Sequence, residues 1–289
     1  MTASGPTLPP PNRPDDRWES QLASIAVGFA ETLRGVPLQS TPPLPPDWLR
    51  VEMLERFLVL RHVGIVAGSS ILEVGSGPHA IATVPLAFET GPTGSIVAAE
   101  PSRWGRFREI VAAAGMAPRV RPVRCDARQL PLAPRSVDLS VCLHGIRSLG
   151  GPDDLQRVVR EMFRVSPRIA LAETLPIATT DAQRAHLAMY DLRHEVFEHA
   201  FGRRDDLPYP SLAALAAIVE SVGGGIESTR VLEIDLPHAL AHFPRSLIEG
   251  LPEGSGRTGL LQRWDDAHAL AERFGTDHPP VGLVIASSG

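Results

Sequence analysis

The chain has 289 residues, 43% of them hydrophobic and 21% charged, which is ordinary for a globular protein with one main domain and an appendage. A formal net charge of −5 offers no basic surface for nucleic acid, and no run of about 18 apolar residues predicts a membrane span. All 28 basic residues are arginines, which excludes lysine-based phosphate binding and Schiff-base chemistry.

The N-terminal part of the chain is predicted to form three segments. Residues 1–15 are rich in proline and small polar residues, which predicts a disordered tail without a signal pattern and favours a cytoplasmic location. Residues 16–45 combine an amphipathic helix, expected over 16–35, with a stiff proline-rich linker. The main domain is expected over 46–289, beginning with a helix over about 47–66.

Short apolar runs alternate with helical patterns from residue 70 onwards. This alternation predicts a parallel, helix-covered α/β sheet. Pro122 lies inside the third run, which indicates an edge strand or an irregular stretch. The expected strands are 70–74, 95–100, 120–126, 137–143, 169–173, 226–236 and 281–286, and the expected helices are 81–88, 104–114, 155–163, 179–201 and 211–222.

Two segments are too long to be simple connections. Residues 179–210 and 237–278 are predicted to act as a lid and an insert, with helical patterns in the insert near 238–251 and 260–274. We expect the insert to fold over the carboxyl ends of the strands, where open α/β sheets bind ligands.

A glycine turn, Gly75-Ser76-Gly77, follows the first expected strand and precedes a helix. Glycine adopts positive φ and lets a ligand approach bare backbone. The helix that follows directs its unpaired N–H groups at the same place. The turn therefore indicates a nucleotide-binding first βα connection.

The order of motifs after this turn resembles that of class I S-adenosylmethionine-dependent methyltransferases. The motifs are Glu73-Val-Gly-Ser-Gly, Glu100 at the end of the second strand, Cys125-Asp126-Ala127 after the third, and Leu130-Pro131 with Ser136-Val-Asp-Leu before the fourth. They are most similar to the type 11, ubiquinone/menaquinone-biosynthesis-like group, over about residues 70–173.

The resemblance implies a Rossmann-like, seven-stranded, mostly parallel sheet with an antiparallel last strand, N-terminal helices and a helical insertion before that strand. It implies S-adenosyl-L-methionine as the cofactor, with Glu100 on the ribose hydroxyls and Asp126 on the adenine amino group. His79 stands where the family often has a third glycine. The expected cofactor-binding residues are Glu73, Gly75, Ser76, Gly77, Glu100, Pro101, Asp126, Ala127 and Leu143.

Other residues are candidates for the acceptor side of the site. His144, directly after the fourth strand, is the best-placed catalytic base, although packing or a cofactor contact would also explain it. Arg147, Tyr190 and Arg193 are candidate substrate contacts. No metal site is predicted: neither Cys125 nor Cys142 has ligand spacing, and His194 and His199 are five residues apart, so they are interpreted as members of i,i+4 surface pairs.

The sequence thus predicts methyl transfer to a small-molecule acceptor, chosen by segments 16–35, 190–201 and 238–274. It predicts no nucleic-acid partner and is compatible with a homodimer. Two alternatives stay open at this point. One is a nicotinamide-dependent oxidoreductase, because the glycine turn and Glu100 also suit a dinucleotide, and the other is a cofactor-binding regulatory protein without catalysis.

Overall fold

A computed structural model of the chain describes residues 27–37, 47–101, 104–202, 207–238, 245–253 and 256–288. The predicted tail over 1–15, the first part of the predicted N-terminal helix and the proline-rich linker lie outside these residues. No helix among the described residues is long and apolar enough to cross a membrane.

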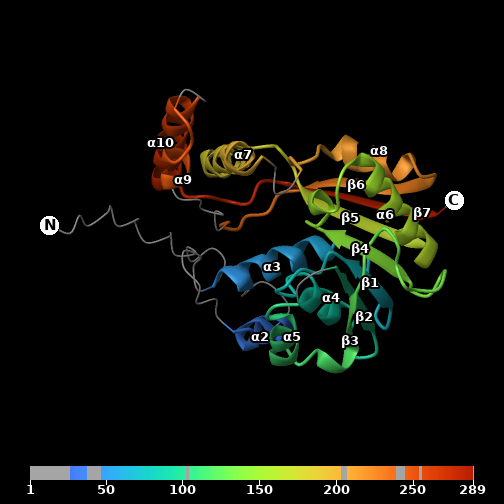
Figure 1. Cartoon of the computed structure of the whole chain (residues 1–289). Coiled ribbons are helices and arrows are strands. Elements are labelled where there is room, and N and C mark those ends of the chain that lie inside the picture. Colours follow the sequence, from blue (N-terminus) through green and yellow to red (C-terminus); the bar gives the residue numbers. More distant parts are fainter. Residues whose placement is uncertain are drawn as a thin grey trace.

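Seven strands form one sheet in the order β3-β2-β1-β4-β5-β7-β6 (Figure 1). All neighbouring pairs from β3 to β5 are parallel, whereas β7 is antiparallel to both β5 and β6, which confirms the predicted topology. The strands are β1 (Ser70–Val74), β2 (Ser95–Glu100), β3 (Val120–Arg124), β4 (Leu139–Leu143), β5 (Arg168–Thr174), β6 (Gly224–Leu232) and β7 (Val281–Ser288).

The register brings the carboxyl ends of the parallel strands to one edge. Val74 pairs with Ala99, so the glycine turn after β1 lies beside Glu100 at the end of β2. Leu143, the last residue of β4, pairs with Ala172 of β5. β3 lies at the edge of the sheet, as Pro122 predicts, because proline has no N–H to give to a second neighbour.

Helices cover both faces of the sheet. Apolar side chains alternate along β1, with Ile71 in the core shared with α2 to α5 and Leu72 in the core shared with α6 and α8. On the first face lie α2 (Val27–Gly35), α3 (Trp48–Leu60), α4 (Thr83–Glu89) and α5 (Phe107–Ala113), and on the second α6 (Pro152–Val165) and α8 (Leu212–Glu220). Two short 3-10 helices, η1 (Ala117–Arg119) and η2 (Ile146–Ser148), complete the connections.

The lid and insert helices pack on one another at one end of the molecule (Figure 1). α7 (Asp181–Phe201), α9 (Arg245–Glu249) and α10 (Arg257–Phe274) share a separate apolar cluster that includes Leu192, Ile248 and Leu260. A capping box between Thr180 and Gln183 starts α7.

The described part of the N-terminal helix belongs to the core. Phe29 and Leu33 of α2 are completely or almost completely buried, and the Phe29 ring stacks on Phe57 of α3 with ring centroids 4.0 Å apart. Truncation at residue 35 would therefore open this core, so the described part of α2 does not form a separable cover over an acceptor pocket.

Several predicted boundaries shift by a few residues for local reasons. β4 begins at Leu139 and not at 137, because the Asp138 carboxylate accepts hydrogen bonds from the Ser70 backbone N–H and hydroxyl at 2.7 and 2.8 Å. α3 ends at Leu60, before Gly64 takes a positive φ of 72°.

A close backbone contact at Gly94 gives a test of the fold. A Cβ at this position would lie 2.9 Å from the Ser69 carbonyl oxygen and 2.4 Å from Thr90 Cβ. We expect Gly94→Ala to lower the free energy of unfolding by about 1–3 kcal/mol, measured by urea denaturation. The control Gly259→Ala, in an open position of α10, should raise it by about 0.5–1 kcal/mol. Equal stability of the two variants would contradict the contact.

Candidate active site

The glycine turn after β1 presents open backbone at the strand-end edge. Gly75 and Gly77 have φ values of 76° and 63°, which favour glycine. Gly77 N–H donates to the Glu100 carboxylate at 3.2 Å, and a Cβ at Gly77 would meet nothing within 4 Å. The buried Ser76 hydroxyl has no hydrogen-bond partner among the described residues. A polar ligand can therefore lie against this turn.

Glu73 lies directly beneath the turn and is 2% exposed. The Thr83 hydroxyl donates to its carboxyl group at 2.5 Å. Burial raises the pKa of Glu73 to about 8, since the favourable bond from Thr83 offsets only part of the desolvation and the Glu100 charge adds to the rise. The carboxyl group is therefore mostly protonated at neutral pH.

The remaining predicted cofactor residues lie along the same edge. The exposed Asp126 carboxylate is held by the Arg128 backbone N–H and guanidinium at 2.7–3.0 Å, and these hydrogen bonds lower its pKa. Ala127 and Leu143 are buried. Pro101 is exposed, and its carbonyl accepts a hydrogen bond from Arg124 at 3.1 Å. The sheet order places these residues side by side with the glycine turn.

His144 is held between two buried carboxylates. Its Nε2 lies 3.1 Å from Glu55 Oε1 of α3, and its Nδ1 lies 3.3 Å from Glu173 Oε1 and 3.2 Å from the Thr174 hydroxyl. The backbone of His144 has a φ of 53°, a conformation that costs free energy in a residue other than glycine. Such strain is typical of functional sites.

The surroundings of His144 favour its charged form. Burial and the nearby Arg56 lower its pKa, but Glu55 and Glu173 outweigh both, so the pKa is raised. Burial alone would raise the pKa of Glu173, yet His144 and Arg147 hold it below its usual value. The charged form donates from both ring nitrogens, so these surroundings favour a His144 that donates to both carboxylates.

Aromatic rings surround Arg147 next to this pair. Its guanidinium lies 5.1 Å from the centroid of Tyr190 and 4.6 Å from that of Tyr209, and it also donates to the Tyr190 hydroxyl. The two tyrosine rings stack with centroids 3.8 Å apart, and the Tyr209 hydroxyl lies 3.1 Å from His186 Nε2. Burial, with His238 and His278, holds the pKa of His186 well below its usual value.

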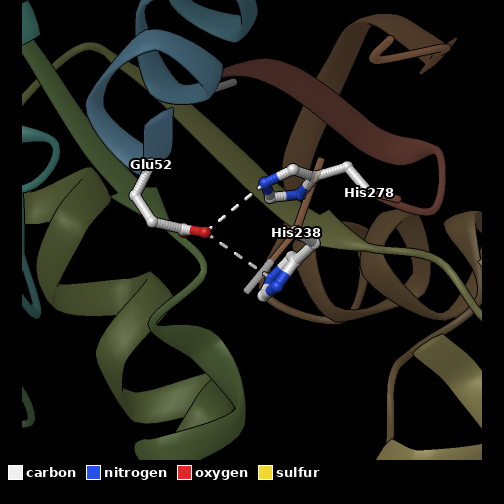
Figure 2. A group of neighbouring side chains, drawn as sticks. All are labelled: Glu52, His238 and His278. Atoms are coloured by element: carbon white, nitrogen blue, oxygen red, sulfur yellow. Dashed lines mark ion pairs between the residues drawn. The ribbon is translucent and has the colours of Figure 1, made fainter. Parts of the chain in front are cut away.

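Glu52, His238 and His278 form a third group (Figure 2), and Glu52 lies on α3 one turn before Glu55. Arg56 links the two parts, since it pairs with Glu52 Oε2 at 3.2 Å and with Glu55. Sequence reasoning missed this group and Glu55, because their residues come from distant segments and carry no spacing motif. Each residue in the following series contacts the next, and the last contacts the first; we call this series the polar circuit: Glu52, His238, His186, Tyr209, Arg147, Glu173, His144, Glu55 and Arg56.

Comparison with known proteins identifies the domain. Residues 72–167 match the type 11 family model described as a methyltransferase domain. The chain contains a class I S-adenosylmethionine-dependent methyltransferase domain. The cofactor of this methyltransferase is therefore S-adenosyl-L-methionine, and the oxidoreductase alternative is not supported.

The chain is also similar to two solved structures, of which the first supports the fold. A cyclopropane-fatty-acyl-phospholipid synthase-like protein from Lactobacillus casei is 16% identical, with a TM-score of 0.68 over 93% of this chain and 99% of that chain. A SAM-dependent methyltransferase from Aquifex aeolicus is 16% identical over 83% of this chain and 92% of that chain, with a TM-score of 0.49. At such identities the likeness concerns the fold alone. No curated protein sequence matches the chain.

The structure places some predicted residues of the methyltransferase away from the circuit. The Arg193 guanidinium lies over Phe197 of the same helix, 5.2 Å from the ring centroid. His194 is buried beside Tyr190, so the interpretation of His194 as a surface residue is wrong. Glu195 pairs with Arg263 of α10. Cys142 is a buried free thiol, and Cys125 is a partly buried one.

The raised pKa of Glu73 predicts a pH-dependent stability. The folded state binds this proton more tightly than the unfolded state, whose carboxyl titrates near 4.5. The contribution of Glu73 to stability is therefore lost as the pH rises from about 5 to 8. As the pH rises from about 5 to 8, the unfolding free energy of Glu73→Gln should increase by roughly 2–4 kcal/mol relative to that of the wild type, as measured by urea denaturation of the ligand-free protein. The control Glu220→Gln, at an exposed position, should gain nothing, and a pH-independent difference for Glu73→Gln would disprove the assignment.

Proposed function

We propose that the methyltransferase methylates a small polar acceptor bound at the carboxyl ends of β4 and β5, beside α7. The observation that carries this proposal is the polar circuit of charged and aromatic side chains from α3, β4, β5, α7 and the segments around Tyr209 and His238. Charged groups are expensive to bury, so their concentration at the ligand-binding edge of the sheet indicates a site selected for function.

The cofactor half of the site uses mainly backbone and strand-end residues. The Gly75–Gly77 turn would hold the methionine portion, Glu100 the ribose, and Asp126 with Ala127 the adenine. The open space beside Gly77 and the unpartnered Ser76 hydroxyl support this fit. When bound, the cofactor supplies an activated methyl group, and the protein contributes positioning and exclusion of water.

The acceptor half favours a small polar molecule over a long acyl chain or a polynucleotide. Its described groups are hydrogen-bonding and charged, and the net charge of −5 opposes nucleic acid. Arg147 and Tyr190 would contact the acceptor directly. We place the reaction in the cytoplasm.

His144 acts in this proposal as a positioning residue. With both ring nitrogens on carboxylates, it ties α3 to β5 beside the transferred methyl group. Its partners are Glu55 from α3 and Glu173 and Thr174 from β5. A base for the acceptor is needed only if the acceptor must lose a proton.

The same contacts support a proposed domain arrangement. The catalytic unit spans residues 46–289, and α2 stabilises its core. The acceptor is selected by the lid and insert segments 179–210 and 237–278, since these supply Tyr190, Tyr209, His238 and His278.

The cofactor half is tested by calorimetry with S-adenosylhomocysteine. Glu100→Ala removes a charged hydrogen-bond acceptor worth about 1.5–3 kcal/mol, so the Kd should rise roughly ten- to a hundredfold. The control Glu109→Ala, on the exposed face of α5, should bind as the wild type does. An unchanged Kd in Glu100→Ala would show that this carboxylate stabilises the glycine turn and does not bind the cofactor. Absence of S-adenosylhomocysteine binding to the wild type would refute the proposed site.

The acceptor half is tested with a small-molecule acceptor found by screening for transfer of a labelled methyl group. Arg147→Lys loses the planar stacking on two tyrosine rings, worth about 1–2 kcal/mol, so kcat/KM should fall roughly five- to thirtyfold. The affinity for S-adenosylhomocysteine should not change. Arg160→Lys, exposed on α6, is the control. If Arg147→Lys weakened S-adenosylhomocysteine binding as much as it lowered kcat/KM, Arg147 would belong to the cofactor half instead.

A further inference from the structure

Glu52, His238 and His278 direct three ligand atoms at one point (Figure 2). Glu52 Oε1 lies 3.4 Å from His278 Nε2 and 3.7 Å from His238 Nε2, and one ligand atom from each residue lies within 4.8 Å of the others. The three residues come from α3, the segment after β6 and the segment before β7.

These separations suit ligands that share a metal ion. Zinc binds imidazole nitrogen and carboxylate oxygen at about 2.0–2.2 Å, so two ligands at a tetrahedral angle lie about 3.3–3.6 Å apart. Hydrogen-bonded atoms would lie closer, at about 2.7–3.2 Å. The observed distances are therefore longer than good hydrogen bonds and close to those between neighbouring ligands of one ion.

Two of the three residues, Glu52 and His278, bury ligand atoms without hydrogen bonds to the described part of the chain. Glu52 Oε1 and both ring nitrogens of His278 have no hydrogen-bond partner among the described residues. Glu52 is 3% exposed and His278 1%. Buried polar atoms normally have a partner, so Glu52 Oε1 and His278 Nε2 point to a missing ligand near both of them.

The neighbouring contacts hold the three side chains in place. Arg56 pairs with Glu52 Oε2 at 3.2 Å, which leaves Oε1 for the two imidazoles. The backbones of His238 and His278 are fixed by a bridge in which His238 N–H donates to Thr276 and His278 N–H donates to Leu236, at 2.9 and 3.0 Å. Gln183 of α7 also donates to the His278 carbonyl at 3.0 Å. Metal sites use outer contacts of this kind to orient their ligands.

We propose that Glu52, His238 and His278 bind a divalent transition-metal ion of the zinc type. Two imidazoles and one carboxylate suit such ions, whereas Mg²⁺ and Ca²⁺ prefer sites built from oxygen ligands. Three protein ligands leave at least one position on the ion open.

The open position would serve the acceptor. His238 lies beside His186, with ring centroids 4.4 Å apart, and His186 contacts Tyr209 of the acceptor half. An oxygen or nitrogen donor of the acceptor can take this position and be held there for methyl transfer. This role rests on the proposed function, whereas binding of the ion does not.

The test is zinc binding by the full-length protein. The protein is stripped with a chelator and dialysed, then titrated with Zn²⁺ by calorimetry, and its metal content is measured after gel filtration. We expect one Zn²⁺ per chain in the wild type, with no comparable binding of Mg²⁺. In Glu52→Gln and His278→Gln the affinity should fall by more than the roughly 10- to 100-fold that loss of an outer contact costs.

The control is His268→Gln, a partly buried histidine stacked on Trp264 of α10, which should bind Zn²⁺ as the wild type does. Circular dichroism and binding of S-adenosylhomocysteine show whether each variant is folded. Absence of stoichiometric Zn²⁺ in the wild type, or unchanged binding in both ligand variants, would overturn the metal site. Zinc binding without any binding of S-adenosylhomocysteine would instead refute the proposed function and leave the metal site intact.

Discussion

The compensation of buried charge on α3 is the constraint on which the active-site edge depends. Glu52, Glu55 and Arg56 are all at most 9% exposed on this helix. An isolated buried charge costs several kcal/mol, and removing one partner of a buried pair destabilises a protein by about 3–5 kcal/mol. Each carboxylate on α3 therefore needs a compensating partner, and the partners come from other elements as well as from Arg56. The chain cannot bury this helix without also assembling His144, His238 and His278 around it.

Helical geometry explains how one helix serves two parts of the site. Residues three and four apart lie on one helix face, so Glu52, Glu55 and Arg56 are neighbours. Glu55 reaches His144 at the end of β4, while Glu52 reaches the histidines of the insert. Arg56 contacts both carboxylates and keeps one oxygen of Glu52 turned away from the imidazoles. The position of the insert is thereby coupled to the sheet through two adjacent turns of α3.

Local patterns in the sequence predicted the sheet well. Alternating apolar residues, the glycine turn and Pro122 each act within a few residues, so the strands, the βα connection and the edge position of β3 could be inferred directly. His144 and Arg147 were also found, but Glu52, Glu55, His186, Tyr209 and His238 of the polar circuit were not, because they come from distant segments and have no common spacing. His194 was misplaced because its i,i+4 pattern indicates a solvated face, but it is buried against the Tyr190 ring of the same helix.

The two halves of the site differ in what determines them. The cofactor half depends on backbone N–H groups and on acids at strand ends, which the sheet order alone brings together. The acceptor half depends on side chains that other elements bring to the edge, and these can change without altering the sheet. His144 joins the halves, since it follows β4 directly and both ring nitrogens reach carboxylates. Its positive φ costs about 1–3 kcal/mol, and the two ion pairs supply a reason for the fold to retain it. In the proposed site, His144 therefore lies between the half that would bind the cofactor and the half that would bind the acceptor.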